Sequence, residues 1–199
     1  MIKEALFIET IKIENGKIYN IKWHNHRCNH TRQVFFADTK PLYLQEYIEA
    51  PPKGLFRCRI LYAKDILSIE YIPYQSKKFN KFNIVQSNIE YNYKYANREL
   101  LDTLKKELSS DSEIIIEKDG LLTDTTIANI AFYDGQSWVT TKKPLLKGTM
   151  RMKLLENGFL KEKEIKSEDI RHFLNFALMN AMIGFQIQKS VIDIRREKI

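Results

Sequence analysis

The chain has 199 residues, of which 44% are hydrophobic and 29% charged, with 7 glycines and 5 prolines. This composition excludes an intrinsically disordered chain, and the length favours one domain or two small ones. The net charge is +7, but the basic residues are scattered, so nucleic-acid binding is not expected as the main function. Because no segment approaches the roughly 20 apolar residues of a membrane span and the N-terminus lacks the apolar stretch of a signal peptide, we expect a cytoplasmic protein without membrane partners.

The N-terminal part of the chain predicts a small α+β layer. Asn15 and Gly16 stand between two apolar runs and tolerate the positive φ angles of a type I′ turn, which is a strong hairpin signal. The predicted elements are hairpin strands 5–13 and 18–23, a helix over about 24–36, and strands 56–61 and 67–74.

The pattern loosens around residues 80–95, and we place a domain boundary there. Residues 1–90 would form a small N-terminal α+β domain, and residues 91–199 a C-terminal domain of mixed helices and strands. Its predicted elements are a helix over 98–108, strands 113–117 and 127–133, turns at Asp119-Gly120 and Asp134-Gly135, and helices over 151–156 and 169–179, with Gly158 placed where a helix ends.

Lys94 is the first candidate for chemistry. It lies among tyrosines and amides, directly before the predicted helix 98–108. An amine in such surroundings could lose its charge through desolvation and act as a nucleophile or base. The alternative is a solvated lysine, which is the common state of this residue type.

The segment 121–130 is the second candidate. It carries Asp124, three threonines and Asn129 in a stretch that otherwise reads as a buried strand. Polar groups at that density need partners, which favours a functional site. A strand with one solvated face, or a turn held by the Asp124 and Thr126 side chains, explains the pattern equally well.

The third candidate is Gly148-Thr149-Met150-Arg151, which opens a predicted helix after the loop 144–147. Unpaired backbone N–H groups and the positive end of the helix dipole favour binding of a phosphate at such a position. A glycine before a helix is also an ordinary cap, so this segment alone is a weak signal.

Taken in this order, the segments resemble the class IV aminotransferases, the pyridoxal-phosphate enzymes of fold type IV. The likeness covers nearly the whole chain and starts at Phe7-Ile8-Glu9-Thr10, which resembles a Phe-Glu-Thr strand with Ile8 inserted. It implies a two-domain α+β fold like that of D-amino acid aminotransferase, pyridoxal 5′-phosphate as cofactor at the domain interface, and a homodimer.

The resemblance also implies roles for individual residues. Arg27 ends a segment that matches His-x-x-Arg, whose arginine binds the cofactor phosphate, and Lys94 falls at the Schiff-base lysine. Asp124 falls at the carboxylate that pairs with the pyridine nitrogen, although it is one methylene shorter than the usual Glu. The phosphate loop corresponds to Gly148, Thr149 and Met150, with the hydroxyl at Thr149 in place of position 150, and the last cofactor segment begins at Asn180 and Ala181.

Within the family, the segments 122–130, 144–151 and 180–182 look most like the lyase branch, which releases pyruvate and 4-aminobenzoate from 4-amino-4-deoxychorismate for folate synthesis. Lys94 and Asp124 would be the catalytic residues. The substrate would be an anionic amine, and Arg57 or Arg59 could bind its carboxylates, although an exposed cationic face is at least as good a reading of these two arginines.

Two other functions remain open from the sequence. The first is an aminotransferase of the same fold that acts on branched-chain or D-amino acids. The second is a catalytically silent cofactor-binding or basic interaction protein, which the presence of Lys94 and Asp124 disfavours. A metal site is not expected, because Cys28 and Cys58 lack a ligand spacing and the four histidines lack a plausible completing ligand.

Overall fold

The computed structural model describes residues 5–189 and 191–198, with side chains for 5–189. The chain divides into two compact units: unit 1 holds Met1–Ser76 with Tyr93–Asn97, and unit 2 holds Lys77–Asn92 with Arg98–Ile199. This division differs from the expected boundary between 90 and 91. Residues 77–92 pack with unit 2, whereas 93–97 return to unit 1 because their backbone bonds to its first strand.

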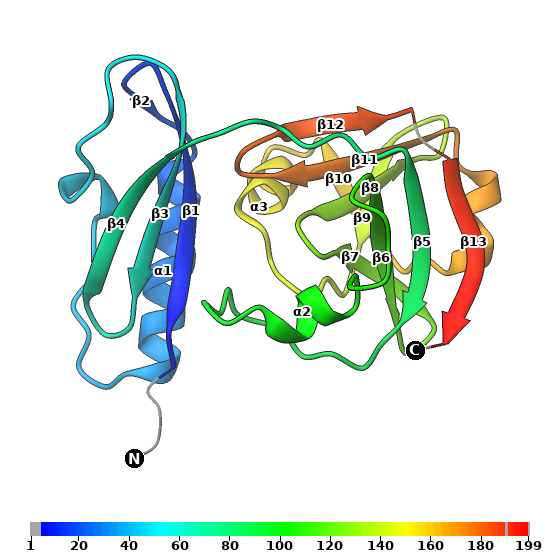
Figure 1. Ribbon diagram of the computed structural model, residues 1–199, viewed down its shortest axis with the longest axis horizontal. Helices are drawn as coiled ribbons and strands as arrows, with labels where there is room; N and C mark the ends of the chain where they lie inside the picture. Colours follow the sequence, from blue (N-terminus) through cyan, green and yellow to red (C-terminus); the bar gives the residue numbers. More distant parts are fainter. Residues whose placement is uncertain (1–4, 190, 199) are drawn as a thin grey trace. The chain divides into compact units, whose positions relative to one another are not determined.

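Unit 1 is a four-stranded antiparallel sheet with one long helix (Figure 1). The strand order is β2-β1-β3-β4, and the elements are β1 (Phe7–Glu14), β2 (Lys17–Ile18), α1 (Ile21–Phe35), the 3-10 turn η1 (Leu44–Glu46), β3 (Leu55–Tyr62) and β4 (Ile66–Pro73). Asn15 and Gly16 have φ angles of 49° and 78°, which confirms the predicted hairpin turn. The predicted return strand 18–23 is wrong beyond Ile18, because Asn20 adopts a left-handed conformation and starts α1.

The core of unit 1 lies on one face of the sheet. Phe7, Ile11 and Ile13 of β1 are fully buried there, together with Cys28 of α1 and Cys58 of β3. Side chains two residues apart along a strand lie on the same face of the sheet. Glu9 therefore lies on the same face as these apolar side chains and is also fully buried. The sheet therefore places a carboxylate inside its own core.

The segment Tyr93–Asn97 completes unit 1 along β1. The Ile8 N–H donates to the Lys94 carbonyl at 2.9 Å, and the Ala96 N–H donates to the Leu6 carbonyl at 2.8 Å. Phe7 and Tyr95 form the bridge between these two bonds. The backbone of Lys94 is thus fixed to the strand that carries Glu9.

Unit 2 is a larger mixed sheet (Figure 1) in the order β10-β9-β8-β7-β6-β5-β13, with β11 paired to both β8 and β12. Its core contains apolar side chains from β5, β6, β8 and β11, such as Phe82, Ile115, Ile130 and Leu178. The elements are β5 (Lys81–Gln86), α2 (Glu99–Thr103), β6 (Ser112–Lys118), β7 (Leu121–Thr125), β8 (Asn129–Tyr133), β9 (Trp138–Thr141), α3 (Thr149–Glu156), β10 (Leu160–Lys163), the 3-10 turn η2 (Ser167–His172), β11 (Asn175–Asn180), β12 (Gly184–Gln188) and β13 (Val191–Lys198).

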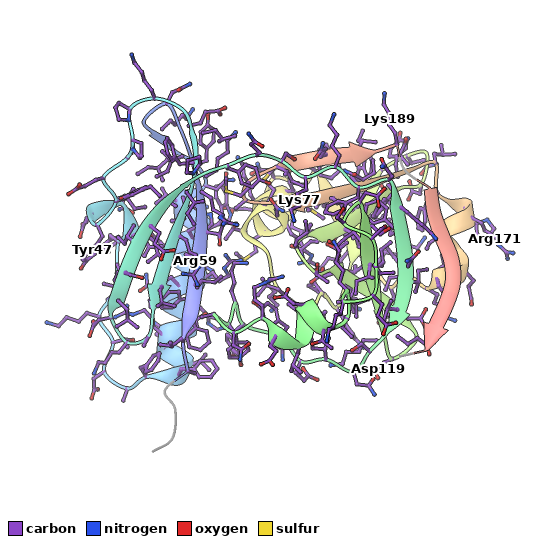
Figure 2. The ribbon with its side chains drawn as sticks, viewed as in Figure 1. Tyr47, Arg59, Lys77, Asp119, Arg171 and Lys189 are labelled. Carbon is purple, nitrogen blue, oxygen red and sulfur yellow. The ribbon has the colours of Figure 1, made fainter. Side chains whose placement is uncertain are left out.

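The sequence predictions for unit 2 are partly confirmed. The predicted α+β class is confirmed. Asp119, labelled in Figure 2, and Gly120 form the predicted turn between β6 and β7, with φ angles of 52° and 75°. Gly158, with a φ angle of 71°, follows the end of α3 as predicted. The predicted helix 169–179 is wrong, because η2 ends at His172 and β11 pairs with β8 and β12. The helix predicted over 98–108 ends at Thr103, and β5 was not predicted.

The longest described helix, α1, has 15 residues. No helix in the described part of the chain has the length and apolarity that a membrane crossing requires.

Candidate functional site

Unit 1 contains a buried group of three ionisable side chains on β1 and α1. Both oxygens of the Glu9 carboxylate accept from the Arg27 guanidinium, Oε1 from Nε at 2.8 Å and Oε2 from Nη2 at 2.7 Å. The Nδ1 atom of His24 lies 2.5 Å from Oε2 of the same carboxylate. Glu9 and His24 are fully buried, and the side chain of Arg27 is 10% exposed.

The charge state of this group follows from its contacts. Burial acts to raise the pKa of Glu9, but the Arg27 charge and the hydrogen bonds from His24 and Arg27 lower it to about 2. Burial lowers the pKa of His24 from its ordinary value. An ionised carboxylate only accepts hydrogen bonds, so a neutral His24 carries its proton on Nδ1 and donates it to Glu9.

Arg27 keeps donors beyond those that Glu9 uses. A guanidinium has five N–H groups in a planar fork, and the bidentate contact occupies one on Nε and one on Nη2. The two on Nη1 and the second on Nη2 lie on the other edges of the same plane. This arrangement suits a phosphate group, which accepts from planar pairs of donors.

Lys94 belongs to the same unit and is half-buried. Its charge contributes to lowering the pKa of His24, so its amine lies within electrostatic range of this group. Tyr93 and Tyr95 on either side of it pack against Phe7, with ring centroids 6.4 and 5.2 Å away. Unit 1 therefore brings together Lys94, Arg27, His24 and Glu9.

Unit 2 contains the second group, built around Asp124 of β7. Asp124 lies directly opposite Asn129 across the β7–β8 hairpin. Its Oδ1 accepts from the Asn129 amide at 2.7 Å, and its Oδ2 accepts from the Leu146 N–H at 2.9 Å. The same Asn129 amide nitrogen donates to the Leu146 carbonyl at 2.8 Å, so the carboxylate and the amide together hold the loop before α3.

Asp124 is a buried carboxylate without an ion pair among the described residues. Burial raises its pKa to about 6, and the hydrogen bonds from Leu146 and Asn129 and the more distant Arg151 charge lower it less than burial raises it. A buried acceptor of this kind is stabilised as an anion by a cationic N–H donor. A protonated pyridine nitrogen is such a donor, so Asp124 fits the role that the family resemblance implies.

Gly148 caps the N-terminus of α3 next to this group. A Cβ at Gly148 would lie 2.0 Å from Oδ1 of Asn129, so any other residue at this position would have to displace the Asn129 side chain. The first bond of α3 runs from the Met152 N–H to the Gly148 carbonyl, which leaves the N–H groups of the first turn, Thr149 and Met150 among them, outside the helical pattern. These N–H groups and the helix dipole favour an anion.

Arg151 has a structural role. It is 3% exposed, and its Nη2 donates to the Thr141 carbonyl at 2.7 Å and to Glu162 at 2.6 Å. Arg151 therefore ties α3 to β9 and β10.

Asn180 organises the β11–β12 turn, in which Ala181 is half-buried. Its Oδ1 accepts from the N–H groups of Met182 and Ile183, at 2.9 and 3.0 Å, and its amide donates to the Ile127 carbonyl at 3.2 Å. Ile127 lies in the short loop between Asp124 and Asn129, so this contact joins the predicted last cofactor segment to the Asp124 group.

Arg57 and Arg59 lie on the face of β3 opposite the core of unit 1 (Figure 2 labels Arg59). Arg59 pairs with Glu70 of β4 at 3.3 Å. The buried Nε of Arg57 has no hydrogen-bond partner among the residues that the structure describes. Because Arg59 is already paired with Glu70, Arg57 is the better candidate of the two for an anionic ligand.

The sequence pattern did not indicate the Glu9–His24–Arg27 contacts or the partnership of Asn129 with Asp124. A signal for Glu9 existed, because a carboxylate at a core-facing position of an apolar strand requires a buried cation. The separations of 15 and 18 residues from His24 and Arg27 hide which cation that is. In the described part of the chain, no group of three or more His, Cys, Asp and Glu residues could hold a metal ion.

The chain is similar to several known proteins. The family model described as amino-transferase class IV matches residues 6–191. An uncharacterized protein of Haemophilus influenzae is 38% identical over 182 residues, which are 88% of this chain and 97% of that protein.

Two solved structures extend the comparison. One is a crystal structure from Haemophilus somnus, provisionally assigned as a 4-amino-4-deoxychorismate lyase. Its TM-score is 0.83 and its sequence identity 34%, and the match covers 92% of this chain and all of that chain. A hypothetical aminotransferase of Mycobacterium tuberculosis in its PLP-bound form has a TM-score of 0.76 and 12% identity, with 96% and 82% of the two chains covered. The second likeness supports the fold alone.

Proposed function

Because the chain belongs to the class IV aminotransferase family, we propose that it is a pyridoxal-phosphate-dependent lyase that releases pyruvate and 4-aminobenzoate from 4-amino-4-deoxychorismate. The observation that carries the cofactor assignment is the buried Asp124, which has neutral hydrogen-bond donors and no ion pair among the described residues. The assignment of the Haemophilus somnus structure, at 34% identity, supports the lyase reaction.

The residues divide the work as follows. Pyridoxal phosphate supplies, when bound, an electron-accepting ring that stabilises negative charge on a substrate atom. When the cofactor is bound, Asp124 would hold a proton on its ring nitrogen, and Arg27, Thr149 and Met150 would bind its phosphate, as the family resemblance implies. Lys94 would hold the cofactor through Nζ. Once the substrate's amino group replaces it there, the freed Lys94 amine would take the proton from C4 of the substrate. Arg57, on the face of β3 opposite the core, would bind a substrate carboxylate.

The test of the attachment is reduction with borohydride followed by peptide mapping. The wild-type protein should be yellow and should carry the reduced cofactor on Lys94, whereas Lys94→Ala should carry none. Lys161→Ala, which changes an exposed lysine on β10, is the matched control and should label like the wild type. Covalent label on the Lys94→Ala protein would contradict the assignment.

The test of the reaction is a pair of assays. With 4-amino-4-deoxychorismate and no added 2-oxo acid, the protein should release pyruvate, detected through lactate dehydrogenase. Exchange between amino acids and 2-oxoglutarate without pyruvate release would instead identify an aminotransferase for branched-chain or D-amino acids.

The proposal extends to the cellular setting. We propose that the reaction serves folate synthesis and that the protein is a homodimer, as the family resemblance implies, and that it acts in the cytoplasm. Sedimentation of the purified protein at twice the 23.6 kDa chain mass would support the dimer.

A further inference from the structure

We infer that Glu9 is a positioning residue that fixes the Arg27 guanidinium for the phosphate group of the cofactor. This inference rests on the proposed function and goes beyond it, because Glu9 acts through Arg27 and has no assigned contact with a ligand. The Glu9 carboxylate supplies orientation, and Arg27 supplies the donors.

The geometry of the contact carries the inference. Two bonds of 2.8 and 2.7 Å define both the position and the plane of the guanidinium, which a single bond cannot do. β1 holds the carboxylate from one side, with Phe7 and Ile11 fully buried on the same face of the strand. Since α1 carries Arg27, the contact also fixes the helix against the sheet at this point.

His24 limits the freedom of Glu9 in turn. It lies one helical turn before Arg27 on α1, is fully buried, and donates from Nδ1 to Oε2, the same oxygen that accepts from Nη2 of Arg27. The carboxylate is therefore held by three hydrogen bonds from two residues of one helix, and its rotation would break all of them.

The charges of Glu9 and Arg27 make the direction of the change in phosphate binding a test of the inference. Glu9 cancels the charge of Arg27, so on Coulomb's law alone its removal would strengthen the binding of a phosphate. If Glu9 instead orients Arg27, its removal weakens phosphate binding although the net charge becomes more positive. The two accounts predict opposite changes.

The measurement compares pyridoxal 5′-phosphate with pyridoxal, which lacks the phosphate. Both are titrated into the purified full chain after removal of bound cofactor, and the ratio of the two dissociation constants reports the phosphate contact separately from the contact with Lys94. In Glu9→Gln, which keeps the size of the side chain, we expect the preference for the phosphorylated compound to fall at least about tenfold, the loss expected when a bidentate charge-assisted contact is broken. An unchanged or increased preference would overturn the inference.

One further variant keeps the inference testable if Glu9→Gln folds poorly. Arg27→Lys keeps the positive charge but cannot form the bidentate contact, so the preference should fall by a similar factor, and a preference within threefold of wild type would contradict the inference. Combining both changes should add little to either single loss, because both remove the same oriented donor. If the fold-loss of preference in the double variant equalled the product of the two single fold-losses, Glu9 would not act through Arg27.

Glu113→Gln is the control matched for burial. Glu113 is also fully buried and ion-paired, to Lys105 at 2.9 Å, but it belongs to β6 of unit 2. Its change should leave the preference for the phosphorylated compound unaltered. If the wild-type protein shows no preference for that compound, the proposed function fails; if it does and the Glu9→Gln ratio is unchanged, only the inference fails.

Discussion

The two units each bury a carboxylate, and the two carboxylates differ in what they face. Glu9 of unit 1 has an arginine and a histidine within 2.8 Å, and its pKa is lowered to about 2. Asp124 of unit 2 is 4% exposed, accepts from an amide and a backbone N–H, and has its pKa raised to about 6 by burial. The two carboxylates are similarly buried, but their pKa values shift in opposite directions, because only Glu9 is paired with a cation, Arg27.

This difference indicates that the charge of Glu9 serves the structure of unit 1, whereas the charge of Asp124 is available to a ligand. The Glu9 group is electrically complete within the protein, and its use lies in the donors of Arg27 that it holds in place. Among the residues that the structure describes, the Asp124 group has no counter-charge at close range, and a ligand that brings a cationic N–H would complete it.

The largest expected effect follows from removing each carboxylate in turn. Glu9→Ala leaves Arg27 buried without its counter-ion and should lower the free energy of unfolding by about 3–5 kcal/mol. Asp124→Ala leaves only neutral donors unpaired and should cost about 1–3 kcal/mol. Urea denaturation of the cofactor-free proteins measures both losses of stability. Equal losses would contradict the difference between an ion-paired Glu9 and an Asp124 with only neutral donors.

Asp124→Asn tests the functional half of the comparison. An amide cannot hold a proton on the ring nitrogen as a carboxylate does, so turnover should fall by at least about 100-fold while the cofactor stays bound. Steady-state kinetics and the absorbance of the bound cofactor measure the two quantities. Asp119→Asn, the same change in the β6–β7 turn where Asn tolerates the positive φ, should match the wild type. Turnover within a few-fold of wild type for Asp124→Asn would assign the role to another group.

The pH dependence of stability should differ in sign between the two groups. The folded pKa of Glu9, about 2, is below its ordinary 4.5, so its stabilising contribution is present above pH 4.5 and is lost as the pH falls toward 2. The folded pKa of Asp124, about 6, is above its ordinary 3.8, so its contribution is present below pH 3.8 and is lost as the pH rises through 6.

Relative to Asp124→Asn, the cofactor-free wild type should therefore lose about 2 kcal/mol of stability between pH 4 and pH 7, at roughly 1.4 kcal/mol for each unit of pKa difference. Relative to Glu9→Gln, it should lose its advantage only on acidification. Urea titrations at several pH values measure both differences. A stability difference between wild type and Asp124→Asn that does not change over this range would contradict the raised pKa of Asp124.

The smallest effect concerns the support of Asp124. In Gly148→Ala the new methyl group would collide with Oδ1 of Asn129, 2.0 Å away, and displace the amide that donates to Asp124. We expect a loss of roughly 1–2 kcal/mol in stability. Thermal unfolding measures it, with Lys147→Ala, a change at the exposed preceding residue, as the control. Equal stability of the two variants would show that Asn129 adapts at no cost.

Local chemistry made part of this fold predictable from the sequence. Asn15-Gly16 and Asp119-Gly120 fix their turns through their own φ preferences, and Gly158 ends α3 for the same reason. The strand β11 was predicted as a helix, because its apolar run suits either structure and pairing with β8, more than 40 positions earlier, decides between them.

The candidate residues show the same limit. The sequence pattern singled out Lys94, Asp124 and the segment at Gly148, and the family resemblance gave them roles. Nothing local indicated that Glu9 would meet Arg27 or that Asn129 would bridge Asp124 to Leu146, because these contacts exist only once strands and loops from separate parts of the chain pack together.

The pairing of Tyr93–Asn97 with β1 has a consequence for the order of folding during synthesis. Unit 1 is discontinuous, so a ribosome that has released residues 1–76 has not yet made the segment that bonds to Leu6 and Ile8 at the start of β1. Between the two lies β5, whose partners β6 and β13 come later still. Until then the nascent chain exposes unpaired strand edges to other chains. A chaperone that binds extended apolar segments would therefore meet this protein through β1 and β5 before its C-terminal strand is complete.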